Sequence, residues 1–94
     1  MYASKSMWNK LERLIEDAEK LSLFPDLISA GFQLATKFSP AVAARRARVY
    51  ARRSGYKKDA IVYGEAVRAL SELRRAFPLV YNNVKSRILA SAPR

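Results

Sequence analysis

The sequence predicts an all-α protein, built as a small helical bundle or as helical hairpins of four to five helices. Apolar residues recur three and four positions apart through most of the chain, no segment alternates like a half-buried strand, and proline and glycine fall between the periodic segments. Because the chain has 94 residues and fifteen of them are alanine, we expect one thin core. The alternative is that the helices are extended and completed by neighbouring copies.

Two helices are expected in the first part of the chain. The first covers about 6–21 and begins at Ser4 or Ser6, because a serine oxygen accepts a hydrogen bond from an unpaired N–H of the first turn. Its apolar positions are Trp8, Leu11, Ile15 and Ala18, with Leu14 and Leu21 beside them. Pro25 suits the first turn of a second helix, which runs to about Phe38. The inward residues of this helix are Leu27, Ile28, Phe32 and Leu34 or Ala35.

The next helix begins at Ser39-Pro40, where serine can cap and proline can occupy the first helical position. It reaches about Ser54, and Gly55 is expected to take the left-handed backbone that often ends a helix. The turn that follows contains Tyr56, Lys57 and Lys58.

Two more helices are expected after this turn. Asp59 can cap the first of them, which carries the clearest core stripe in the chain. The stripe consists of Tyr63, Ala66, Leu70, Leu73 and Phe77. Pro78 ends or bends this helix, and a last segment runs to about Ala90. Its apolar side holds Val80 or Tyr81, Val84 and Ile88.

Charge divides the chain, although no repeat or linker divides residues 1–94 into more than a single helical domain. Residues 1–36 carry four basic and five acidic groups, whereas residues 37–94 carry fourteen and three. We read 1–36 as a near-neutral packing and assembly part and 37–94 as a strongly basic part. A net charge of +10 is typical of a protein that binds a polyanion, above all nucleic acid.

The composition makes an enzyme unexpected. The chain has no cysteine and no histidine, and therefore lacks the thiol nucleophile, the commonest general base and the usual metal ligands. We expect no cofactor and no metal. No apolar run approaches a membrane span, and the N-terminus does not fit a secretory signal. We expect a protein that is intracellular or within a virion or nucleoprotein particle.

The helix that begins at Pro40 has two sides. On a helical wheel its five arginines share one broad side and its alanines the other, with Tyr50 at the edge of the alanine strip. Alanines let another helix approach closely, and arginine holds phosphate through a planar pair of donors. The predicted nucleic-acid contact consists of Arg45, Arg46, Arg48, Arg52, Arg53, Lys57 and Lys58.

Other interpretations of this helix are weaker. A helix that is basic for solubility alone would mix charge signs, and a membrane-binding helix would carry large apolar residues in place of alanine. Tyr50 and Tyr56 could stack on bases, although a tyrosine near a helix end more often packs its ring. A further nucleic-acid contact or a solvated face is formed by Arg74, Arg75, Lys85 and Arg87.

The near-neutral part has a candidate assembly surface. The first helix exposes a large apolar side and an acidic cluster that could meet a basic surface of another copy. The alternative is that this helix closes a monomeric bundle. The candidate residues for self-assembly are Trp8, Leu11, Leu14 and Ile15.

Together these observations predict a non-enzymatic, largely sequence-independent nucleic-acid-binding and packaging protein. It would wrap or coat nucleic acid, double-stranded DNA in preference to RNA, as a homo-oligomer, filament or shell such as a virion coat, a nucleocapsid or a chromatin-type protein. The alternatives are a helix-turn-helix transcription regulator and an RNA-bound protein of ribosomal type. The opening of the helix after Asp59 offers few donors to base edges, which disfavours the regulator.

Overall fold

Five α-helices and two short 3-10 helices make up the regular structure of residues 5–91, the part of the chain that the computed structural model describes. No strand is present within these residues, so the predicted all-α class is confirmed. Ser4, one of the two expected caps, lies outside them. In chain order the elements are α1 (Lys5–Glu19), η1 (Lys20–Leu23), η2 (Pro25–Leu27), α2 (Ile28–Lys37), α3 (Pro40–Arg53), α4 (Ala60–Ala76) and α5 (Pro78–Ser91).

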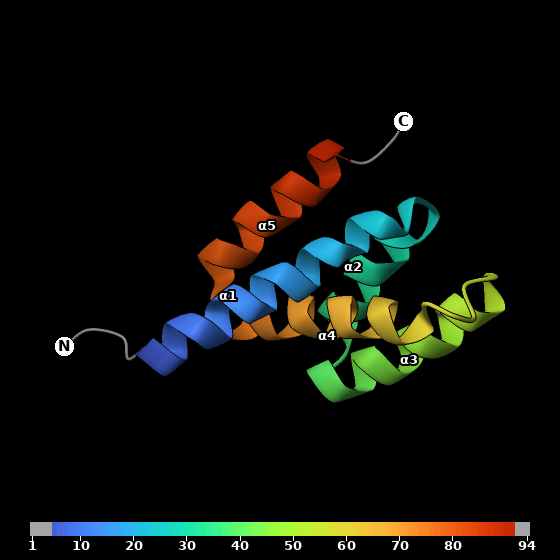
Figure 1. Cartoon of the computed structure of the whole chain (residues 1–94), viewed down its shortest axis with the longest axis horizontal. Helices are drawn as coiled ribbons and strands as arrows, with labels where there is room; N and C mark the ends of the chain where they lie inside the picture. The colour runs from blue at the N-terminus through green and yellow to red at the C-terminus, as the bar shows by residue number, and fades with distance from the viewer. Residues whose placement is uncertain (1–4, 92–94) are drawn as a thin grey trace.

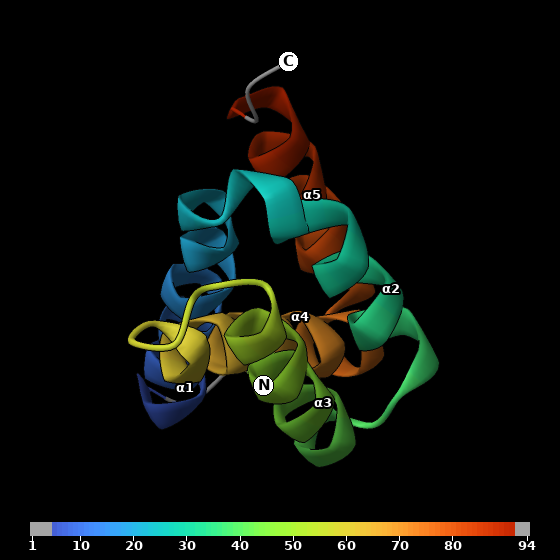
Figure 2. The same ribbon diagram turned by 90° about the vertical axis from the view of Figure 1, so that its right-hand side faces the viewer.

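The helix α4 lies at the centre of the molecule, with α1 and α3 against different sides of it (Figure 1). Figure 2 shows α2 between α3 and α5, so that α2 closes the side of the bundle that α1 leaves open. The Cα radius of gyration is 12.9 Å, close to the roughly 13 Å of a compact domain of this size. The chain is therefore compact and not extended, and completion of its core by neighbouring copies stays a prediction.

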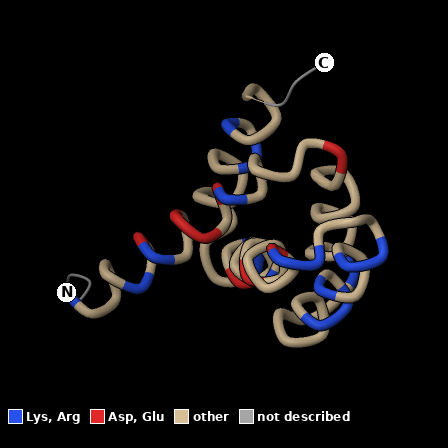
Figure 3. Tube along the Cα trace, turned by 45° about the vertical axis from the view of Figure 1, so that its right-hand side comes forward, with Lys and Arg blue, Asp and Glu red and all other residues tan. Residues whose placement is uncertain are grey.

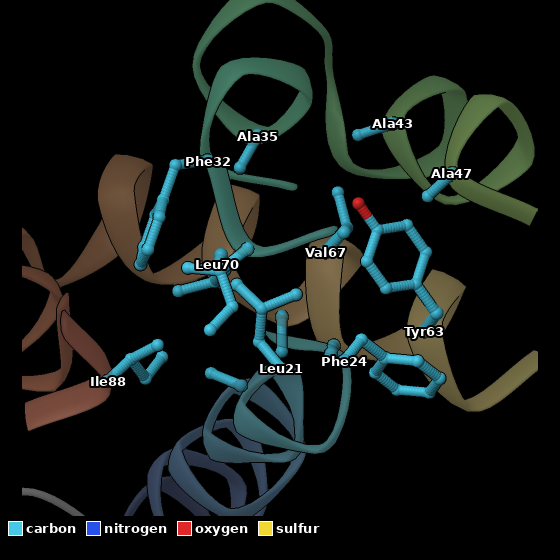
Figure 4. Close-up of a cluster of buried hydrophobic side chains, with 14 of the residues drawn as sticks. Leu21, Phe24, Phe32, Ala35, Ala43, Ala47, Tyr63, Val67, Leu70 and Ile88 are labelled. Carbon is cyan, nitrogen blue, oxygen red and sulfur yellow. The ribbon is translucent and has the colours of Figure 1, made fainter. Parts of the chain in front are cut away.

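Large side chains from every helix except α3 meet in the core around α4 (Figure 4). The predicted stripe on α4 is confirmed, since all its members are buried except Phe77, which is half-buried at the helix end. The hydroxyl of Tyr63 donates a hydrogen bond to the carbonyl of Leu27 at 2.9 Å. Burial raises the pKa of Tyr63, so this hydroxyl stays protonated and remains a donor.

The end of α3 matches its prediction closely. Gly55 has a φ of 95°, the left-handed conformation in which glycine carries no Cβ penalty. The N–H of Tyr56 donates to Ala51 at 2.9 Å and the N–H of Gly55 donates to Arg52 at 3.2 Å. These two bonds form a Schellman motif, which satisfies the last carbonyls of α3 and turns the chain toward α4.

Other boundaries differ from the expected ones in detail. The first helix becomes 3-10 after Glu19, and Pro25 opens η2 before α2 starts, because proline and the tight corner interrupt the regular hydrogen bonding. Ser39 and Asp59 precede α3 and α4 as expected, but neither side chain makes a capping hydrogen bond. None of the described helices has both the length and the apolar character needed to cross a membrane.

Candidate nucleic-acid interface

The alanine side of α3 is packed against α4, as the wheel predicts. Its members Ala43, Ala44, Ala47 and Ala51 are all buried. Opposite them, α4 carries Gly64, and a Cβ placed there would lie 3.0 Å from the carbonyl oxygen of Ala44. The two backbones therefore approach as closely as small residues allow, and the arginines of α3 are fixed on a helix that lies flat against the body.

Arg48 differs from the other arginines of α3 because its stem lies across α4. A Cβ at Gly64 would meet Cγ of Arg48 at 2.6 Å, which shows that the stem occupies the space above this glycine. Arg48 is half-buried, whereas Arg45, Arg46, Arg52 and Arg53 are exposed. The five arginines predicted as one set therefore separate into groups with different surroundings.

A groove of about 660 Å³ lies between α2 and α3. Its cationic members are Arg45, Arg46 and Arg53 from α3 and Lys37 from the end of α2. Its other lining residues are Ala30, Gln33, Leu34, Phe38, Val49 and Tyr50. Arg48 and Arg52 do not line it. The groove thus combines a basic rim with a partly apolar wall in which Val49 is 41% and Tyr50 42% exposed.

No acidic residue lines this groove, and no α3 arginine is ion-paired with another described residue. In Figure 3 the basic positions of α3 and the following turn gather on one side of the molecule, away from the acidic positions of α1. The guanidinium of Arg46 lies over the ring of Phe38, with Cζ 4.4 Å from the ring centroid. This cation–π contact orients Arg46 without neutralising its charge.

The turn between α3 and α4 is fixed by Tyr56. Its hydroxyl donates to Oδ1 of Asp26 at 2.9 Å, and its ring meets that of Phe24 edge-to-face at 5.2 Å between centroids. The hydrogen bond to Asp26, with some desolvation, raises the pKa of Tyr56. Packing is thus what the structure shows for this ring, while Lys57 and Lys58 are exposed on the same turn.

The second basic set is divided by the fold. Arg87 pairs with Glu19 at 3.0 Å between α5 and α1, whereas Lys85 lies over the ring of Phe32 with Nζ 5.4 Å from the centroid. Arg74 and Arg75 are exposed at the end of α4. Within α4, Arg68 forms an ion pair with Glu72 one turn later, with 3.2 Å between Nε and Oε1.

The candidate assembly residues also have different positions. Leu14 is buried within the single chain, and Leu11 and Ile15 are half-buried against the core. Trp8 is 57% exposed, because the first turns of α1 extend past the end of α4 (Figure 1). Self-association stays a prediction, and the structure leaves Trp8 as the large side chain of this set that remains accessible.

Sequence reasoning missed the α2 side of the groove. Lys37 begins the basic part of the chain, but nothing in the local pattern shows that it and Phe38 face Arg46. Comparison of the chain with family models, with curated proteins and with solved structures finds no match.

Proposed function

We propose that this protein is a non-enzymatic, largely sequence-independent binder of nucleic acid, which contacts phosphates through the groove between α2 and α3. The observation that carries the proposal is a basic groove without an acidic lining residue. Three arginines and a lysine converge there from two helices, with no ion pair to any described residue. Unpaired arginines repel one another, so a surface that gathers them is best explained by an anionic partner.

The geometry of α3 favours contact with the phosphate backbone. The close approach of α3 to α4 fixes its backbone, so that the exposed guanidinium groups project from a rigid support. Phosphate contacts position a protein but carry no sequence information directly. We expect similar affinity for duplexes of unrelated sequence.

The alternative of a helix-turn-helix regulator would make α4 the recognition helix. Its opening residues Ala60, Tyr63 and Gly64 are buried, and Ile61 is the exposed apolar one among them. The opening turn of α4 therefore presents an isoleucine and few donors or acceptors, which disfavours direct readout of base edges. This supports backbone binding by α3.

Within this proposal the bound polymer is double-stranded DNA in preference to RNA, and the protein coats or wraps it as a nucleoprotein assembly. The exposed Trp8 at the projecting end of α1 is a candidate contact between copies. A particle of virion-coat, nucleocapsid or chromatin type would result. An RNA-bound protein is the remaining alternative. The titration described next distinguishes it from a DNA-bound protein, because it compares both polymers.

The test is a salt titration of binding to random-sequence duplex DNA, with matched RNA and single-stranded DNA, while light scattering follows particle size. We compare the wild type with a groove variant, Arg45→Gln/Arg46→Gln/Arg53→Gln. If each arginine neutralises one phosphate, the negative slope of log K against log salt becomes shallower by roughly 2.7 in the variant.

The matched control removes three exposed charges from α1, as Lys5→Gln/Lys10→Gln/Arg13→Gln. This variant has the same net charge as the groove variant and should keep a near-wild-type slope. Equal losses in both variants would show that net charge, and not the groove, drives binding. Weak binding of the wild type to all three polymers would overturn the proposed function. Tight binding without growth in particle size would support nucleic-acid binding but contradict the proposed assembly.

A further inference from the structure

A second hollow adjoins the groove on the far side of α2. It measures about 240 Å³ and is lined by Phe32, Gln33, Thr36, Lys37 and Lys85. Gln33 and Lys37 line both this hollow and the groove. They therefore form a ridge on α2 that separates two hollows, one facing α3 and the other facing α5, in agreement with the place of α2 between these helices in Figure 2.

The two hollows are built in the same way. In each, a phenylalanine near or within α2 lies beneath a cation that comes from a different helix. Arg46 of α3 lies over Phe38 at 4.4 Å, and Lys85 of α5 lies over Phe32 at 5.4 Å. Lys37 stands between them at the shared ridge.

Lys85 is also available for an anion. No ion pair joins it to any residue in the described range, and none of the residues that line its hollow is acidic. Arg87, two positions along the same helix, is 3.0 Å from Glu19 of α1. Residues two apart on a helix project to different sides, so α5 directs Lys85 toward a basic surface and Arg87 into an ion pair.

We propose that a single nucleic-acid molecule bound in the groove continues across the ridge of α2, so that its phosphates are contacted in succession by the arginines of α3, by Lys37 and by Lys85. This inference rests on the proposed function and adds the path of the polymer to it. A path over three helices holds more phosphates than α3 alone, because each additional cation displaces further counterions from the backbone. Of the four residues in the second basic set, it assigns Lys85 to the nucleic acid and Arg87 to the surface ion pair with Glu19 of α1.

The experiment compares Lys85→Gln with Arg87→Gln in the full chain, by salt titration on random-sequence duplex DNA. Both variants lose one positive charge from α5. We expect the negative slope of log K against log salt to become shallower by about 0.9 for Lys85→Gln and to stay unchanged for Arg87→Gln. Lys85→Arg should restore the slope, because it keeps the charge at the same place.

Thermal unfolding of each variant checks that the bundle is intact. A second measurement does not depend on the variants: backbone amide NMR signals of Gln33 and Thr36 in the wild type should shift when duplex DNA is added. Equal slopes for Lys85→Gln and the wild type, or silent signals at Gln33 and Thr36, would overturn the path. If the path is overturned but the groove variant still loses binding, the proposed function stands. If the wild type does not bind duplex DNA at all, the proposed function and the proposed path are both wrong.

Discussion

The helices α1 and α3 pack against the same central helix, α4, but they do so by different means. α1 contributes large residues such as Leu14 to the core, and its surface mixes acidic and basic groups. α3 contributes buried alanines, and its outer side carries four exposed arginines with no ion pair to a described residue. A helix that buries little apolar volume can lie very close to its neighbour, which makes α3 a flat and rigid support for charge.

The largest expected effect on stability lies on the α1 side of this comparison. Leu14→Ala removes a buried leucine from between α1 and α4, and should lower the free energy of unfolding by roughly 2–5 kcal/mol. Urea unfolding followed by circular dichroism measures this loss. The control Leu79→Ala, at a position that is 78% exposed on α5, should change stability by less than about 0.5 kcal/mol. A similar loss in both variants would mean that α1 does not close the core.

On α3 we expect a larger side chain, and not a smaller one, to destabilise the protein, because small residues already fill the contact with α4. Ala47→Leu forces a larger side chain between α3 and α4, and should cost roughly 1–3 kcal/mol of unfolding free energy. Ala41→Leu places the same side chain at an exposed position of the same helix and is expected to be nearly neutral. If Ala47→Leu were as stable as Ala41→Leu in the same urea titration, the close approach of the two helices would be incorrect.

A smaller effect is expected at the polar contact inside the core. Tyr63→Phe leaves the buried carbonyl of Leu27 without its donor at 2.9 Å, which should cost about 1–2 kcal/mol. Tyr50→Phe changes an exposed tyrosine and serves as the control. Thermal unfolding of the two variants tests whether this hydrogen bond between η2 and α4 stabilises the fold. An unchanged unfolding temperature for Tyr63→Phe would show that it does not.

The smallest expected change in stability is the difference between removing an ion-paired arginine and removing an unpaired one. Arg87→Gln removes the 3.0 Å ion pair with Glu19 and should lower stability by at most about 1 kcal/mol, less so at high salt. Arg45→Gln removes a charge that has no described partner and lies away from the C-terminal end of α3, and should leave stability equal or slightly higher, because repulsion within α3 decreases. Unfolding in urea at low salt would contradict the comparison if Arg45→Gln were less stable than Arg87→Gln.

Local patterns were enough to predict the class and most helix ends. The Schellman end at Gly55 and the stripe on α4 follow from residue type and spacing, because each depends on a few neighbouring positions. Trp8 shows the limit of this reasoning: it has the spacing of a core residue, yet the helix continues past its partner there.

The candidate site was predictable in part for the same reason. The arginine side of α3 follows from the wheel, but the partners of Arg46, Arg48 and Lys85 come from other helices and depend on how these helices pack. Lys85 and Arg87 lie on different sides of α5 because they are two residues apart on a helix. Spacing within one segment carries no information on which of them an acidic residue of α1 will reach.

The measurement that tests the central claim most directly is arginine Nε–Hε NMR of the wild-type protein titrated with random-sequence duplex DNA. The signals of Arg45, Arg46 and Arg53 should shift strongly, since these side chains line the groove, while those of Arg68 and Arg87 should move little because both are ion-paired elsewhere. Shifts spread evenly over all arginines, or concentrated on Arg13 of α1, would contradict a binding site between α2 and α3.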